Sequence, residues 1–118
     1  MKSNEKIKDY IFVRCDSAFI KIRLKDILCI KAEGDYVHVY TADKNEAHTL
    51  HCTLKSIEER LPASKFYRIN RFCLIALDHI DKVEKDRAYI GEIDFQISRQ
   101  CKMQLLEKLN LVTEWRGN

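Results

Sequence analysis

The sequence of 118 residues predicts a single, mostly β domain with two helices. Apolar and polar residues alternate in many short runs, and clusters of Asp, Asn, Gly and Ser separate these runs. No strand–helix–strand repeat is present, which argues against a parallel sheet. Hydrophobic residues make up 46% of the chain and charged residues 33%, which excludes a disordered chain and a membrane-spanning one. The amino terminus is polar rather than signal-like, so we expect a cytoplasmic protein.

Five short strands are expected in the first half of the chain. In the second of them Ile20 and Ile22 alternate with Lys21 and Arg23, so this strand has one solvent-facing side. Turn-forming residues separate the strands, which predicts a β-meander that begins with a hairpin. The expected strand ranges are 10–14, 19–24, 27–32, 36–41 and 47–52.

A short helix is expected after these strands. Thr53 can cap its first turn, and Pro62 ends it. The apolar residues of this segment recur at helical spacing, at Leu54, Ile57 and Leu61. We therefore expect this helix to have a structural role.

The second half of the chain predicts four more strands and a closing helix. The expected strands cover 72–75, 80–85, 87–90 and 94–97, of which the first is an apolar run that should be buried. Ser98 can cap the closing helix. An apolar stripe follows along it, made of Cys101, Leu105, Leu106 and Leu109. The tail 111–118 either continues this helix or frays.

No group of residues in the sequence is typical of catalysis or metal binding. A nucleophile beside a base, a phosphate-binding loop and a dinucleotide turn are all absent, so we expect neither an enzyme nor a cofactor. His48, His51 and Cys52 form the most metal-like group, but in one strand the two histidines would point to opposite faces. The five cysteines are spread singly along the chain, without a Cys-x-x-Cys pair. This distribution predicts reduced, buried thiols at Cys15, Cys29, Cys52, Cys73 and Cys101.

Positive charge is concentrated in one segment, although the net charge is only +3. Residues 65–72 contain Lys65, Arg68 and Arg71 and no acid, whereas acids collect between residues 78 and 94. This segment is either a solvated loop anchored by its aromatic residues or an anion-facing loop. In the second case Asn70 and Arg71 can reach phosphates or base edges.

Arg99 directly follows the predicted helix cap Ser98. A cation in the first helical turn opposes the helix dipole, and such an exception to local rules often marks a functional residue. If a phosphate lay at this helix end, the free backbone N–H groups, the dipole and Arg99 would all favour it. The alternative is an exposed arginine without a role.

Taken in order, these segments resemble the LytTR (LytR/AlgR-type) DNA-binding domain family of bacterial response regulators. The resemblance runs from Ile11 to Leu109. It divides the chain into a lead-in (1–9), a LytTR-like domain (10–110) and a tail (111–118). The matching segments are the strand and acidic-Gly turn at 26–36, the helix at 54–61, the FYRINRFCLIA segment at 66–76, the strand at 80–83 and the FQISR motif at 95–99.

The resemblance implies about ten short antiparallel strands in three sheets, with loops inserted into the major groove of double-stranded promoter DNA. It places the DNA contacts at Gly34, Asp35, Tyr36, Val37, Asn70, Arg71 and Arg99. We expect Lys65 and Arg68 to hold the DNA backbone. The resemblance also implies binding to direct repeats, with a possible homodimer on DNA. We expect no cofactor, metal, membrane contact or small-molecule substrate.

Three residues depart from the family pattern. Asn70 replaces the usual His, Phe72 replaces Ser and Ala76 replaces Asn, so that Phe72 lacks a hydroxyl donor and Ala76 an amide. The main hypothesis is a sequence-specific, DNA-binding transcription regulator. The alternative is a protein-interaction module that keeps the fold and has lost DNA binding. A buried Phe72 would favour the main hypothesis, and an exposed Phe72 would favour the alternative.

Overall fold

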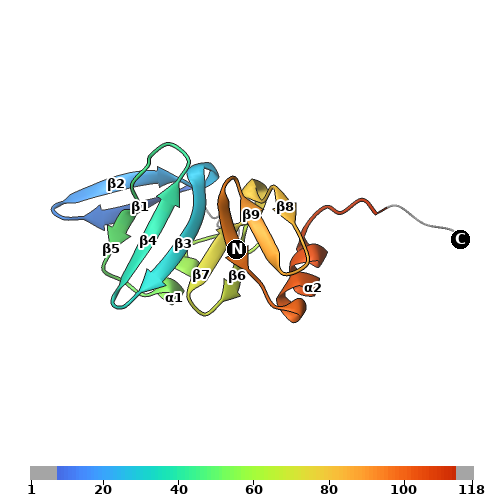
Figure 1. Cartoon of the computed structure of the whole chain (residues 1–118). Coiled ribbons are helices and arrows are strands. Elements are labelled where there is room, and N and C mark those ends of the chain that lie inside the picture. The colour runs from blue at the N-terminus through green and yellow to red at the C-terminus, as the bar shows by residue number, and fades with distance from the viewer. Residues whose placement is uncertain (1–7, 114–118) are drawn as a thin grey trace, which may run out of the picture.

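The computed structural model describes residues 8–113, which form ten strands and two α-helices (Figure 1). The strands are β1 (Tyr10–Cys15), β2 (Ala18–Arg23), β3 (Ile27–Glu33), β4 (Tyr36–Thr41), β5 (His48–Leu50), β6 (Phe66–Asn70), β7 (Cys73–Ala76), β8 (Lys82–Val83), β9 (Arg87–Ile90) and β10 (Ile93–Gln96). The helices are α1 (Leu54–Glu58) and α2 (Arg99–Lys108), and 3-10 turns occur at Leu24–Asp26 and Leu77–His79.

All three sheets are antiparallel, which confirms the predicted mostly β class. The central sheet has the strand order β5-β4-β3-β7-β6, while β1 pairs only with β2 and the third sheet has the order β10-β9-β8. The β-meander predicted for the first five strands is wrong between β2 and β3, because these two strands do not pair. The 3-10 turn Leu24–Asp26 redirects the chain there, and β3 pairs with β4 and β7.

The central sheet is buried on both faces by two hydrophobic clusters. The first cluster includes Ile30 and Leu74 and joins the sheet to the β1–β2 hairpin and α1. The second includes Cys29 and Ile75 and joins the sheet to β9, β10 and α2. Because alternate residues of a strand face opposite sides, a strand covered on both faces is apolar throughout, as β7 is.

Both predicted helix caps are confirmed. The Thr53 hydroxyl accepts a hydrogen bond from the Ser56 backbone N–H at 3.1 Å, and the Ser98 hydroxyl accepts one from the Cys101 N–H at 3.0 Å. α1 is shorter than predicted, because the chain tightens after Glu58 and the Leu61 N–H bonds to the carbonyl three residues earlier. Leu61 is nevertheless buried, as its place in the apolar pattern requires.

One strand, β6, was not among the strands predicted from the residue pattern. The remaining differences concern the ends of elements. The predicted strand 47–52 is paired only over β5, because residues 51 and 52 form a bend before the helix cap. The predicted strand 80–85 is reduced to β8, and β10 begins one residue earlier than expected. The tail does not continue α2 between residues 109 and 113, while residues 1–7 and 114–118 lie outside the described part of the chain.

The five cysteines are free thiols. Cys29, Cys73 and Cys101 are buried as predicted, whereas Cys15 and Cys52 are half-buried. Burial raises the pKa of Cys29 to about 11 and that of Cys73 to about 12, so both side chains are neutral at physiological pH.

Within residues 8–113, no three His, Cys, Asp or Glu side chains are grouped so that they could hold a metal ion. His48 lies in β5, and His51 lies beyond the end of that strand. None of the helices described here is long and apolar enough to cross a membrane.

Candidate nucleic-acid interface

Two turns lie side by side at one end of the central sheet. Gly34 and Asp35 connect β3 to β4, and Arg71 and Phe72 connect β6 to β7. Since β3 and β7 are antiparallel neighbours, the end of β3 meets the start of β7, and the Ala32 N–H donates to the Phe72 carbonyl at 2.8 Å. Both turns lie along the lower edge of the molecule in Figure 1. Segments far apart in the sequence therefore share one surface.

The β3–β4 turn is made tight by a glycine in the left-handed region. Gly34 has a φ of 61°, and the residues on either side of the two-residue turn, Glu33 and Tyr36, are paired across the strands. Asp35 is exposed and Tyr36 is half-exposed, with its ring centroid 5.1 Å from that of His51. Val37 has no exposed surface, so its side chain supports the core and does not reach a partner.

The β6–β7 turn is held by side chains on both sides. The Asn70 side-chain oxygen accepts from the Phe72 N–H at 2.8 Å, and an Arg68 guanidinium nitrogen donates to the Arg71 carbonyl at 3.0 Å. The same guanidinium binds the Glu58 carboxylate of α1 through two hydrogen bonds, at 2.9 and 3.1 Å. Arg68 therefore ties α1 to the turn, and the turn presents Arg71 and Phe72 to solvent.

Lys65 and Arg68, which the sequence placed at the DNA backbone, both have acidic partners. The Lys65 ammonium lies 3.0 Å from the Asp78 carboxylate, at the opposite end of β6 from Asn70. The Arg68 side chain is only 30% exposed and is paired with Glu58. In this segment the exposed polar residues next to the β3–β4 turn are Asn70 and Arg71.

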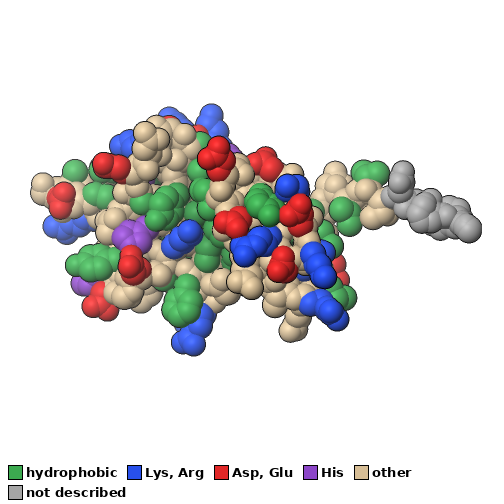
Figure 2. Space-filling model, in the orientation of Figure 1, with side chains coloured by type: hydrophobic (Ala, Val, Ile, Leu, Met, Phe, Trp, Pro, Cys, Tyr) green, Lys and Arg blue, Asp and Glu red, His purple; other side chains and the backbone are tan. Residues whose placement is uncertain are grey.

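Arg99 is exposed at the first position of α2. The start of α2 lies along the same lower edge as the two turns (Figure 1), where basic side chains are also visible in Figure 2. The end of β10 lies beside the β6–β7 turn, since Gln96 lines the same cavity of about 300 Å³ as Asn70 and Phe72. Among residues 8–113, no acidic side chain forms a salt bridge with Arg71 or Arg99.

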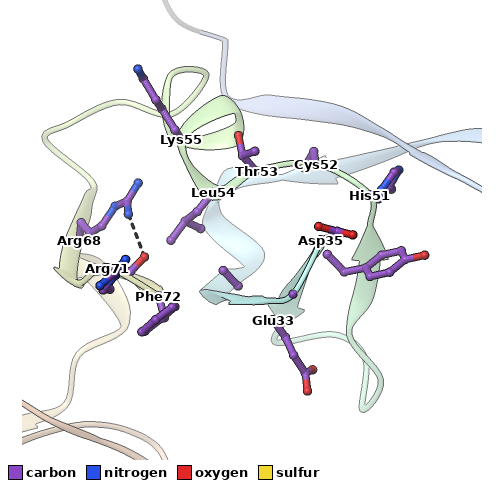
Figure 3. Close-up of a pocket in the computed structure, with 13 residues that line it drawn as sticks. Glu33, Asp35, His51, Cys52, Thr53, Leu54, Lys55, Arg68, Arg71 and Phe72 are labelled. Atoms are coloured by element: carbon purple, nitrogen blue, oxygen red, sulfur yellow. Dashed lines mark hydrogen bonds between the residues drawn. The ribbon is translucent and has the colours of Figure 1, made fainter.

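An open groove of about 680 Å³ separates the two turns (Figure 3). Gly34, Asp35 and Tyr36 line one side of it, and Arg68, Arg71 and Phe72 line the other. The third wall is the segment from His51 to Lys55, which sequence analysis did not assign to the site. That segment has no basic cluster, and only the fold brings it between the two turns.

The departures from the family pattern lie in different environments. Asn70 uses its side-chain oxygen inside the turn, and its amide nitrogen remains available as a donor. Ala76 is buried in the first cluster and adds nothing to this surface. Phe72 is 58% exposed, which is the condition that favours the protein-interaction alternative.

Comparisons with known proteins agree with this architecture. The family model described as the LytTr DNA-binding domain matches residues 17–110. One similar solved structure is the LytTr DNA-binding domain of a methyl-accepting/DNA response regulator from Bacillus cereus. Its TM-score is 0.71 at 15% sequence identity, over 88% of this chain and 99% of that chain. The chain belongs to the LytTr family of DNA-binding regulatory domains.

Proposed function

We propose that the protein is a sequence-specific transcription regulator that binds double-stranded promoter DNA. The binding edge consists of the β3–β4 turn, the β6–β7 turn and the start of α2. One observation carries the proposal: Arg71 and Arg99 are exposed on this edge, and neither forms a salt bridge within residues 8–113. An arginine without a carboxylate partner keeps its whole planar fork for phosphates or guanine.

Each residue of the edge is proposed to contribute according to its chemistry. Arg71 and Arg99 bind guanine O6 and N7 bidentately, and Asn70 donates from its amide nitrogen to a purine or a phosphate. Asp35 accepts a hydrogen bond from cytosine N4. Gly34 and Tyr36 place the β3–β4 turn, and the Tyr36 hydroxyl can reach the DNA backbone.

Lys65 and Arg68 receive different roles. Lys65 can contact the backbone at the periphery of the interface, since its exposed pair with Asp78 is weak and easily exchanged. Arg68 is engaged with Glu58 and with the Arg71 carbonyl, so we assign it a positioning role.

The proposed mode of assembly is a pair of copies on direct repeats. A single small module buries about 600–1,000 Å² on DNA, which limits its affinity. Two copies on adjacent sites would combine their binding free energies through effective concentration.

The test is selection from a pool of random duplexes at two salt concentrations. We expect an enriched sequence and, for about five phosphate contacts, a slope of log affinity against log salt near −4.5. Arg71→Ala and Arg99→Ala should lose the enrichment. Arg14→Ala is the matched control, because Arg14 is an exposed arginine on the β1–β2 hairpin and should retain it.

A second candidate function is supported by the exposed Phe72 ring. In that case the fold serves as a protein-interaction module, and the β6–β7 turn docks a protein surface. No enriched duplex together with a flat salt response would contradict DNA binding and favour this second candidate.

A further inference from the structure

Phe72 is an apolar side chain that the fold holds at the surface. Its backbone N–H is bound by the Asn70 side chain, and its carbonyl accepts from the Ala32 N–H, both at 2.8 Å. The backbone of this residue is therefore fixed on both sides while its ring is 58% exposed. A contact through this residue therefore requires no further ordering of the backbone.

The ring has a specific neighbour. The Arg71 guanidinium lies over it, 5.3 Å from the ring centroid, and Figure 3 shows both side chains on the same side of the groove. Phe72 also lines both the groove between the turns and the cavity next to Gln96. An apolar group thus stands next to a planar donor at the centre of the proposed binding edge.

This pair of side chains matches a pair of neighbouring bases in the major groove. An arginine fork fits guanine O6 and N7, and the thymine 5-methyl group is the apolar feature that a phenylalanine can contact there. The family pattern that the sequence resembles implies a serine at this position, and a serine could only exchange hydrogen bonds. The substitution therefore changes the chemistry of this contact from polar to apolar.

We infer that Phe72 is a specificity-determining residue that contacts the 5-methyl group of a thymine adjacent to the base bound by Arg71. The inference rests on the proposed DNA-binding function. It also explains why the Phe72 ring is exposed, and this explanation requires no protein partner.

The experiment uses the full chain and the duplex enriched in the selection described above. Each thymine of that duplex is replaced in turn by deoxyuridine, which removes only the methyl group. We expect the affinity of the unchanged protein to fall about fourfold at one position, because one buried methyl group is lost there. For Phe72→Ala and for Phe72→Ser, the same replacement should leave the affinity unchanged.

Two controls accompany the scan. Phe19→Ala removes a ring that is 70% exposed on the β1–β2 hairpin, and it should keep the fourfold loss at the same thymine. Thermal unfolding midpoints of both Phe72 variants should match that of the unchanged protein, since an exposed ring contributes little to the core.

The possible failures are distinguishable. If a duplex is enriched but no thymine shows a loss that depends on Phe72, the inference is overturned and DNA binding stands. A fourfold loss that persists in Phe72→Ala assigns the methyl contact to another residue and also overturns it. If no duplex is enriched, the proposed function fails and the inference fails with it.

Discussion

At the scale of single residues, two glycines adopt the same backbone conformation in different parts of the chain. Gly34 has a φ of 61° and Gly91 a φ of 59°, and a Cβ at either position would meet no atom within 4 Å. Alanine at these positions would therefore cost backbone strain without a clash, about 1–2 kcal/mol each. Gly34 lies in the proposed DNA-binding edge, whereas Gly91 connects β9 to β10.

This pair separates loss of stability from loss of binding. Gly34→Ala and Gly91→Ala should lower the free energy of unfolding by similar amounts, about 1–2 kcal/mol in urea titrations. Only Gly34→Ala should weaken DNA binding, because it changes the β3–β4 turn. Equal effects of the two variants on the affinity for the enriched duplex would contradict the assigned role of this turn.

Phe72 shows where residue-level prediction from sequence stops. It begins an apolar run, so the sequence predicted it as the first residue of a buried strand. The pairing of β6 with β7 contains a register shift between Arg68 and Asn70, and the turn then falls on Arg71 and Phe72. A bulge of this kind depends on the partner strand, so the local pattern of apolar residues does not reveal it.

At the scale of elements, α1 contributes to the proposed site through one ion pair. Glu58 on α1 binds Arg68 on β6, and Arg68 binds the Arg71 carbonyl in the β6–β7 turn. The sequence predicted the start of α1 and its cap correctly but gave no indication of this connection. Glu58 and Arg68 are ten residues apart and belong to different elements, so only the tertiary fold brings them together.

The role of Arg68 can be measured through the salt dependence of binding. Arg68→Met should weaken DNA binding several-fold by releasing the turn, while the slope of log affinity against log salt stays unchanged. Asp78→Asn, which breaks the exposed Lys65 pair, is the control and should not weaken binding. A slope made less steep by about 0.9 in Arg68→Met would instead identify a direct phosphate contact, as the sequence suggested.

At the scale of the whole molecule, one sheet divides the interior into two clusters. Leu74 and Ile75 are consecutive residues of β7, yet Leu74 packs in the first cluster and Ile75 in the second. Both side chains are almost completely buried. Because β3, β4, β6 and β7 contribute side chains to both clusters, we expect the domain to unfold as one cooperative unit.

Truncation of either side chain tests this expectation. Leu74→Ala and Ile75→Ala should each lower the free energy of unfolding by about 2–5 kcal/mol. The transitions followed by far-ultraviolet circular dichroism and by tyrosine fluorescence should coincide in both variants. Two separated transitions in either variant would show that the clusters unfold independently.

The sequence predicted the fold class, both caps and most strand positions, because these depend on local pattern and turn chemistry. The number of sheets came from the family resemblance and is confirmed. The pairing of β3 with β7 joins residues more than forty positions apart, for example Cys29 with Ile75. Local patterns do not specify such a partner. The predicted meander therefore places β2 beside β3, where the structure has β7.

The bond from Ala32 to the Phe72 carbonyl has a consequence for how such a domain can evolve. It joins β3, just before the β3–β4 turn, to the β6–β7 turn through main-chain atoms, and every amino acid except proline can supply the donor. Exposed side chains that do not themselves hold a turn, such as that of Arg71, can then change with little effect on the geometry of the edge. New operator preferences can then accumulate on an unchanged framework.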